Sequence, residues 1–117
     1  MRSVLIVDDD AEYRQGLKVF LSKNYEVLEA ANGNDGLLLL NQKPVDLVIT
    51  DILMPDREGI ETIQAMRRQR PDLKIIVISA VDSVTLRIAE RMGENATFSK
   101  SASFELLAEM IDRVARE

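Results

Sequence analysis

The most informative stretch of the sequence is Val4-Leu5-Ile6-Val7-Asp8-Asp9-Asp10, an apolar run that ends in three aspartates. Two other short runs are apolar at every position, Leu47-Val48-Ile49 and Ile75-Ile76-Val77-Ile78. Each run is too short for a helix and rich in β-branched residues, which is typical of strands covered on both faces in a parallel sheet. Residues 26–30 and 96–99 alternate between apolar and polar, which indicates partly exposed edge strands.

Helical periodicity fills the segments between these strands. Apolar residues recur at helical spacing at positions 13, 17, 20 and 21, at 60, 63 and 66, and at 107, 110, 111 and 114. Shorter helical segments are predicted at 34–42 and 83–91. Because crossovers between parallel strands are right-handed, five such units predict an α/β doubly wound (βα)5 sheet. With the alternating strands at the edges, the fold is flavodoxin-like, a five-stranded parallel sheet of order 2-1-3-4-5.

Composition limits the function classes. The 117 residues predict one domain, 1–117, and its formal charge of −5 argues against nucleic acid as a direct partner. The sequence contains no His and no Cys, which excludes imidazole bases, cysteine nucleophiles, thiolate metal sites and disulfides. The first apolar run is too short for a signal peptide or a membrane span, so we expect a cytoplasmic protein without membrane contact.

Polar side chains follow four of the predicted strands. Asp8 and Asp9 come after the first, Asp51 after the third, Ser79 closes the fourth, and Lys100 follows the fifth. We interpret Asp10 as a helix N-cap. Carboxyl ends of parallel strands share one edge of the sheet, so the other carboxylates should crowd together and require a cation, for which Mg²⁺ is suited. With Lys100 to hold an anion, this is a phosphoryl-transfer arrangement in which an aspartate can be the nucleophile. The spacing does not say which aspartate attacks.

Four motifs in this order carry a family resemblance: residues 5–10, residues 47–55 with Gly59, residues 77–80, and Lys100. From about residue 3 to residue 114 the chain resembles the receiver domain of two-component response regulators. The resemblance implies a signalling switch of a two-component system or phosphorelay. Its only reactions would be Mg²⁺-dependent self-phosphorylation and slow autodephosphorylation, so it would not be an enzyme in the usual sense.

The resemblance also implies a role for each site residue. Asp51 would accept a phosphoryl group from the phosphohistidine of a sensor histidine kinase or phosphotransfer protein. Asp8, Asp9 and Asp51, with the backbone carbonyl of Leu53, would hold Mg²⁺, while Ser79 and Lys100 would contact the phosphoryl group. The helix at 83–91, the strand at 96–99 and the last helix would then repack for an output domain or target protein. Formation of a homodimer on activation is left open.

The sequence departs from the family pattern at several positions. Thr97 stands where an aromatic residue usually lies three positions before the lysine, and we predict that Phe98 belongs to the core. Ser101 replaces the proline that commonly follows the lysine. Leu53 and Val81, two residues beyond Asp51 and Ser79, are both apolar. We expect them to hinder an attacking water and slow the loss of the phosphoryl group.

Two alternatives remain beside this interpretation. One is a pseudo-receiver that binds partners without phosphorylation, which the substitutions at Thr97 and Ser101 keep open. The other is a phosphohydrolase of the haloacid dehalogenase type, whose motif Asp8-x-Asp10 superficially matches, although Glu12 stands where that family expects Thr. The sequence does not decide whether the chain is a complete regulator or part of a longer protein.

Overall fold

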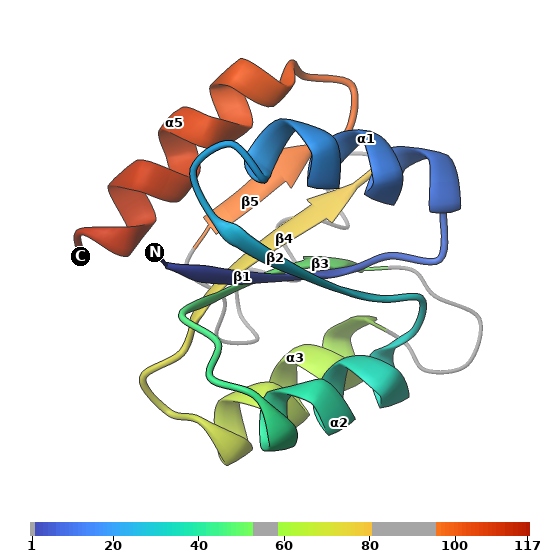
Figure 1. The fold of residues 1–117 in the computed structure, drawn as a ribbon. Coiled ribbons are helices and arrows are strands. Elements are labelled where there is room, and N and C mark those ends of the chain that lie inside the picture. The colour runs from blue at the N-terminus through green and yellow to red at the C-terminus, as the bar shows by residue number, and fades with distance from the viewer. Residues whose placement is uncertain (1, 53–58, 81–95) are drawn as a thin grey trace.

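The structure is a computed structural model that describes residues 2–52, 59–80 and 96–117. Its five strands form one sheet in which every pairing is parallel, and their order is β2-β1-β3-β4-β5 (Figure 1). The strands are β1 (Ser3–Val7), β2 (Glu26–Ala30), β3 (Leu47–Asp51), β4 (Lys74–Ser79) and β5 (Ala96–Ser99). The predicted fold class and strand order are confirmed.

Helices cover both faces of this sheet. The helices α1 (Ala11–Leu21) and α5 (Phe104–Ala115) lie on one face, and α2 (Gly33–Gln42) and α3 (Gly59–Gln69) lie on the other (Figure 1). The helix predicted at 83–91 falls outside the described residues. None of the helices in the described ranges is both long and apolar enough to span a bilayer.

Side-chain caps set the start of three helices. Asp10 accepts hydrogen bonds from the backbone N–H groups of Glu12 and Tyr13, which confirms it as the N-cap of α1. Ser103 caps α5 in the same way, and Asn32 caps α2. Such caps satisfy N–H groups that have no partner within the helix. The cap at Asp10 begins α1 directly after the loop that carries Asp8 and Asp9.

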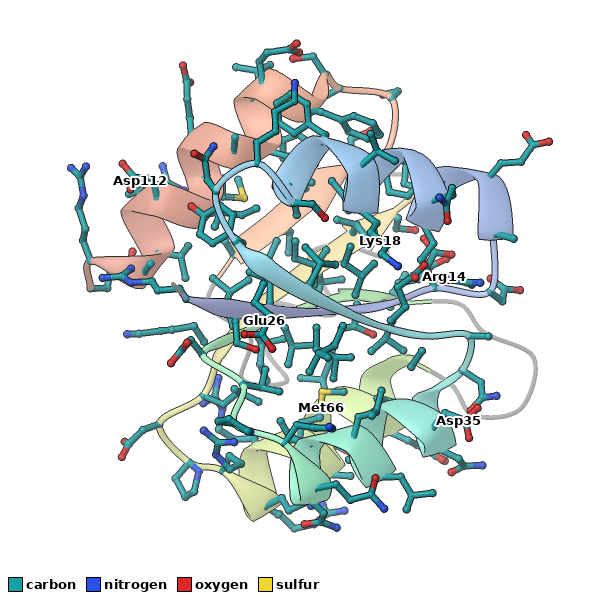
Figure 2. The ribbon with its side chains drawn as sticks, viewed as in Figure 1. Arg14, Lys18, Glu26, Asp35, Met66 and Asp112 are labelled. Atoms are coloured by element: carbon teal, nitrogen blue, oxygen red, sulfur yellow. The ribbon has the colours of Figure 1, made fainter. Side chains whose placement is uncertain are left out.

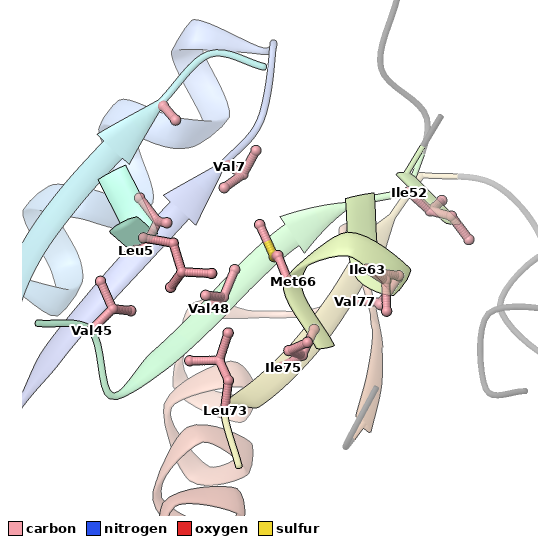
Figure 3. Close-up of a cluster of buried hydrophobic side chains, with 12 residues drawn as sticks. Leu5, Val7, Val45, Val48, Ile52, Ile63, Met66, Leu73, Ile75 and Val77 are labelled. Carbon is pink, nitrogen blue, oxygen red and sulfur yellow. The ribbon is translucent and has the colours of Figure 1, made fainter. Parts of the chain in front are cut away.

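The hydrophobic core is divided by the sheet into two clusters. Every residue of β1 and β3 is buried, as predicted for central strands, whereas β2 is only partly covered. On the α2–α3 face, Ile63 and Met66 pack over Val48 and Val77 (Figure 3). Side chains of α1 and α5 fill the opposite face. The sheet is therefore held on both sides, which makes its edge a rigid support for a site.

Gly36 allows α2 to approach the sheet closely. A Cβ atom at this position would lie 2.9 Å from Cγ2 of Val7, closer than side-chain atoms normally approach. Val7 is fully buried and β-branched, so its methyl group has little room to move. The absence of a side chain at Gly36 is thus a packing requirement of the strand that leads into Asp8.

Candidate functional site

The register of the strands brings Asp8 and Asp51 to the same edge of the sheet. Val7 is paired with Thr50 on β3, so the next residue of each segment, Asp8 and Asp51, lies at the same level. The backbone N–H of Asp8 donates to the carbonyl of Ala30 on β2, and Asp51 is paired with Ile78 on β4. This edge is formed by the carboxyl ends of the strands, where ligands of doubly wound sheets bind.

The structure brings together three of the four predicted metal ligands, the carboxylates. One carboxylate oxygen from each of Asp8, Asp9 and Asp51 can be chosen so that all lie within 4.8 Å of one another. Asp8 is fully buried and Asp51 nearly so, whereas Asp9 is exposed to solvent. Crowded carboxylates repel unless a proton or a cation lies between them, and oxygen donors of this kind suit a hard divalent ion. The donor set therefore fits Mg²⁺.

Lys100 is the cation that the structure places in this cluster. Its Nζ lies 2.7 Å from Oδ2 of Asp8 and 3.0 Å from Oδ2 of Asp51, and its side chain is only 12% exposed. The backbone N–H of Lys100 donates to the carbonyl of Ser79, which joins the end of β5 to the end of β4. The buried Ser79 lies at the same edge of the sheet. The side chains of Asp8, Asp9, Asp51 and Lys100 thus lie together, and Ser79 stands at the adjacent strand end.

Burial and neighbouring charges shift the pKa values of Asp8 and Lys100. Burial raises the pKa of Asp8, while the ammonium of Lys100 and the backbone N–H of Asp10 lower it in part, and the nearby charge of Asp51 raises it. Burial acts to lower the pKa of Lys100, but the carboxylates of Asp8 and Asp51 outweigh it, so that the pKa is raised. Lys100 is therefore charged at neutral pH and neutralises one of the three carboxylates.

Arg14 supports the loop of the site and was missed by the sequence analysis. Its Nη1 donates to the backbone carbonyl of Asp8 at 2.6 Å, and its Nε donates to Glu29 on β2 at 3.1 Å. Lys18 lies one turn further along α1, near Arg14 (Figure 2). Its Nζ lies 2.9 Å from the same carboxylate. The ammonium of Lys18, and to a smaller extent the guanidinium of Arg14, lowers the pKa of Glu29 although its partial burial acts to raise it. The spacing of Arg14 and Lys18 on one helical face was the only signal available in the sequence.

The other positions singled out in the sequence lie on β5, in the loop after it, or outside the described residues. Phe98 is buried in the core beneath α1 and α5, as predicted, and Thr97 is half-buried. The Oγ atoms of Ser101 and Ser99 lie 2.7 Å apart, a contact between the last residue of β5 and the loop that follows it. Leu53, with its expected carbonyl ligand, and Val81 lie outside the described residues.

Comparison with known proteins identifies the family. Residues 4–112 match the family model described as Response regulator receiver domain. The chain therefore belongs to the response regulator receiver domain family, whose members are phosphoacceptor signalling switches of two-component systems.

Relatives with curated names agree with this assignment. The chain is 39% identical over 87 residues to the response regulator MprA of Mycolicibacterium vanbaalenii, which covers 74% of this chain and 38% of that protein. It is 31% identical over 114 residues to the probable C4-dicarboxylate response regulator DctR of Bacillus subtilis, which covers 94% of this chain and 50% of that protein. The chain thus spans half or less of the length of these relatives.

Solved structures show the same fold. A CheY-like receiver domain protein from Methanospirillum hungatei is 28% identical with a TM-score of 0.93, covering 99% of this chain and 94% of the other. The response regulator TrrA of Thermotoga maritima, solved in complex with Mg²⁺ and BeF, is 31% identical with a TM-score of 0.89, covering 97% of this chain and 99% of the other.

Proposed function

We propose that Asp51 is the phosphoacceptor of this receiver domain and that phosphorylation requires Mg²⁺. The carrying observation is the convergence of three carboxylates, with the ammonium of Lys100 in contact with both Asp8 and Asp51. Asp8 is fully buried, whereas Asp51 keeps some access to solvent, with its side chain 9% exposed. A nucleophile must be reachable by its donor, which favours Asp51 over Asp8.

In the proposed reaction, a carboxylate oxygen of Asp51 attacks the phosphorus of the donor. A P–O bond to Asp51 forms, and the P–N bond of a phosphohistidine on a sensor kinase or phosphotransfer protein breaks. The imidazole leaves with the electron pair and takes up a proton. With a small donor such as acetyl phosphate, the broken bond is P–O and acetate leaves. No protein group of this chain needs to act as a base, which agrees with the absence of His and Cys.

Asp8, Asp9 and Asp51 are the residues that would hold Mg²⁺, with the carbonyl of Leu53 as a further expected ligand. The bound ion would neutralise charge on the phosphoryl oxygens. We propose that Lys100 contacts a phosphoryl oxygen, which the 3.0 Å distance between its Nζ and Oδ2 of Asp51 supports. The position of Ser79, at the end of the neighbouring strand, supports its proposed contact with the same group.

The output is proposed by family resemblance. A phosphoryl group on Asp51 adds negative charge that attracts Lys100 and Ser79. Because β5 leads to Lys100 and α5 follows it, both would repack together with the helix expected at 83–91. An output domain or a target protein would recognise this change. We propose that the receiver domain and this partner are cytoplasmic.

Intact mass after incubation with acetyl phosphate tests the proposal. We expect one added phosphoryl group in the presence of Mg²⁺, none with EDTA, and none in the Asp51→Asn variant. Labelling that persists in this variant would move the acceptor elsewhere. If neither acetyl phosphate nor a phosphorylated histidine kinase labels the wild type, the protein is a pseudo-receiver. Steady release of phosphate from small phosphoesters would instead favour the phosphohydrolase alternative.

A further inference from the structure

An aromatic ring forms the third neighbour of the Lys100 ammonium. The ring centroid of Tyr13 on α1 lies 4.8 Å from Nζ, within the range of a cation–π interaction. The Tyr13 hydroxyl is buried and makes no hydrogen bond within residues 2–52, 59–80 and 96–117. Burial raises the pKa of this phenol, so the ring is uncharged at neutral pH. The contact with Lys100 is therefore made by the ring, not by the hydroxyl.

Packing from the other end of the chain holds this ring in place. Phe104, the first residue of α5, meets Tyr13 edge-on, with ring centroids 5.6 Å apart and planes at 77°. Phe20, two turns along α1, packs on Phe104 at 5.7 Å. Between them, a Cβ at Gly16 would lie 3.5 Å from the Phe104 ring, so Phe104 lies close against the helix backbone. Tyr13 is thus restrained by Phe104 of α5, which is itself held against α1 by Phe20 and by the backbone at Gly16.

We propose that Tyr13 is a positioning residue of the phosphoryl-transfer site, whose ring holds the ammonium of Lys100 beside Asp51. This inference rests on the proposed function, since it assigns a role within the same site. A lysine has a flexible four-carbon stem that can adopt many rotamers. Two carboxylates and an aromatic face together confine its charged end, and the attraction of the ring is lost when an aliphatic side chain replaces it.

The first test measures the initial rate of Asp51 labelling by acetyl phosphate in saturating Mg²⁺. We expect Tyr13→Leu to be labelled about fivefold more slowly than the wild type, the factor for a partly buried cation–π contact. Tyr13→Phe keeps the ring and should be labelled at the wild-type rate. Phe20→Leu is the matched control, because Phe20 also packs on Phe104 from α1 but has Lys23, not Lys100, over its ring.

The second test does not depend on phosphorylation. A double-mutant cycle of Tyr13→Leu and Lys100→Met, followed by urea unfolding, isolates the interaction between the two side chains. We expect Lys100→Met to change the unfolding equilibrium constant about fivefold less in the Tyr13→Leu background than in the wild type. In the Phe20→Leu background, its effect should equal that in the wild type.

The two tests separate failure of the inference from failure of the proposed function. An additive cycle, or a wild-type labelling rate in Tyr13→Leu, would overturn the role of Tyr13 while leaving Asp51 as the acceptor. Slow labelling of Tyr13→Phe would also overturn it, since that result would assign the effect to the hydroxyl. If the wild type itself is not labelled by any donor, the proposed function fails, and a coupled cycle would still establish the contact with Lys100.

Discussion

Replacing Lys100 by Met should reveal how strongly the carboxylate cluster depends on its own cation. Methionine keeps most of the apolar stem but removes the ammonium that lies 2.7 Å from Asp8 and 3.0 Å from Asp51. Removing one partner of a buried ion pair costs about 3–5 kcal/mol, because the other charge stays desolvated and uncompensated. Since the side chains of Lys100 and Asp51 keep 12% and 9% exposure, we expect the lower end of this range, about 3 kcal/mol.

Lys18→Met provides the matched control. Lys18 also lies within 3 Å of a carboxylate, that of Glu29 at 2.9 Å, but its side chain is 42% exposed. An exposed ion pair contributes about 0–1 kcal/mol, so this variant should lose less than about 1 kcal/mol. The same substitution at two ion-paired lysines therefore differs mainly in burial.

The assay is urea unfolding followed by far-UV circular dichroism, with EDTA and with Mg²⁺. A divalent ion held by the three carboxylates would replace the missing charge, so Mg²⁺ should stabilise Lys100→Met more than it stabilises the wild type. Equal losses for Lys100→Met and Lys18→Met would refute the electrostatic reasoning. A Mg²⁺ effect of the same size in both proteins would show that Lys100 does not compensate the carboxylates that bind the ion.

Three further predictions concern packing, pH and the lifetime of the phosphorylated state. In urea unfolding, Gly36→Ala should lower the free energy of unfolding by about 1 kcal/mol, because overpacking against Val7 at 2.9 Å exceeds the gain in helix propensity. Gly16→Ala, whose new Cβ would make ordinary contacts at 3.5 Å, should raise it by up to about 1 kcal/mol. The opposite order would contradict this packing argument. The pKa of Glu29 is lowered from its ordinary value of 4.5, so its ion pairs stabilise the fold above that pH and are lost as the pH falls through the folded pKa. Glu29→Gln should therefore cost up to about 1 kcal/mol at pH 7 and progressively less as the pH falls below 4.5, and a pH-independent loss would argue against the ion pairs. Replacing Leu53 and Val81 together by polar residues should shorten the half-life of the phosphorylated protein, measured by intact mass, and an unchanged half-life would exclude their proposed shielding.

Much of the candidate site followed from local sequence patterns. A strand covered on both faces needs apolar residues at every position, and the central strands showed this pattern without interruption. Once the strands are parallel, their carboxyl ends must share one edge, which brings Asp8, Asp51, Ser79 and Lys100 together whatever the packing details. Side-chain caps are equally local, which is why Asp10 was predicted correctly as the start of α1.

The supporting contacts of the site, in contrast, were decided only by the tertiary structure. Tyr13 has the spacing of an ordinary core residue, and only the packing of α1 against α5 brings its ring to Lys100. Arg14 reads as a surface residue, yet the crossing of α1 over the sheet edge brings it to the carbonyl of Asp8. The contact of Tyr13 with Lys100 joins segments distant in sequence, and that of Arg14 with Asp8 depends on how α1 lies against the loop after β1. Both depend on how helices and strands pack, which periodicity does not encode. The sequence by itself therefore determined which charged groups meet at the sheet edge, and the tertiary structure decided which neighbours hold them there.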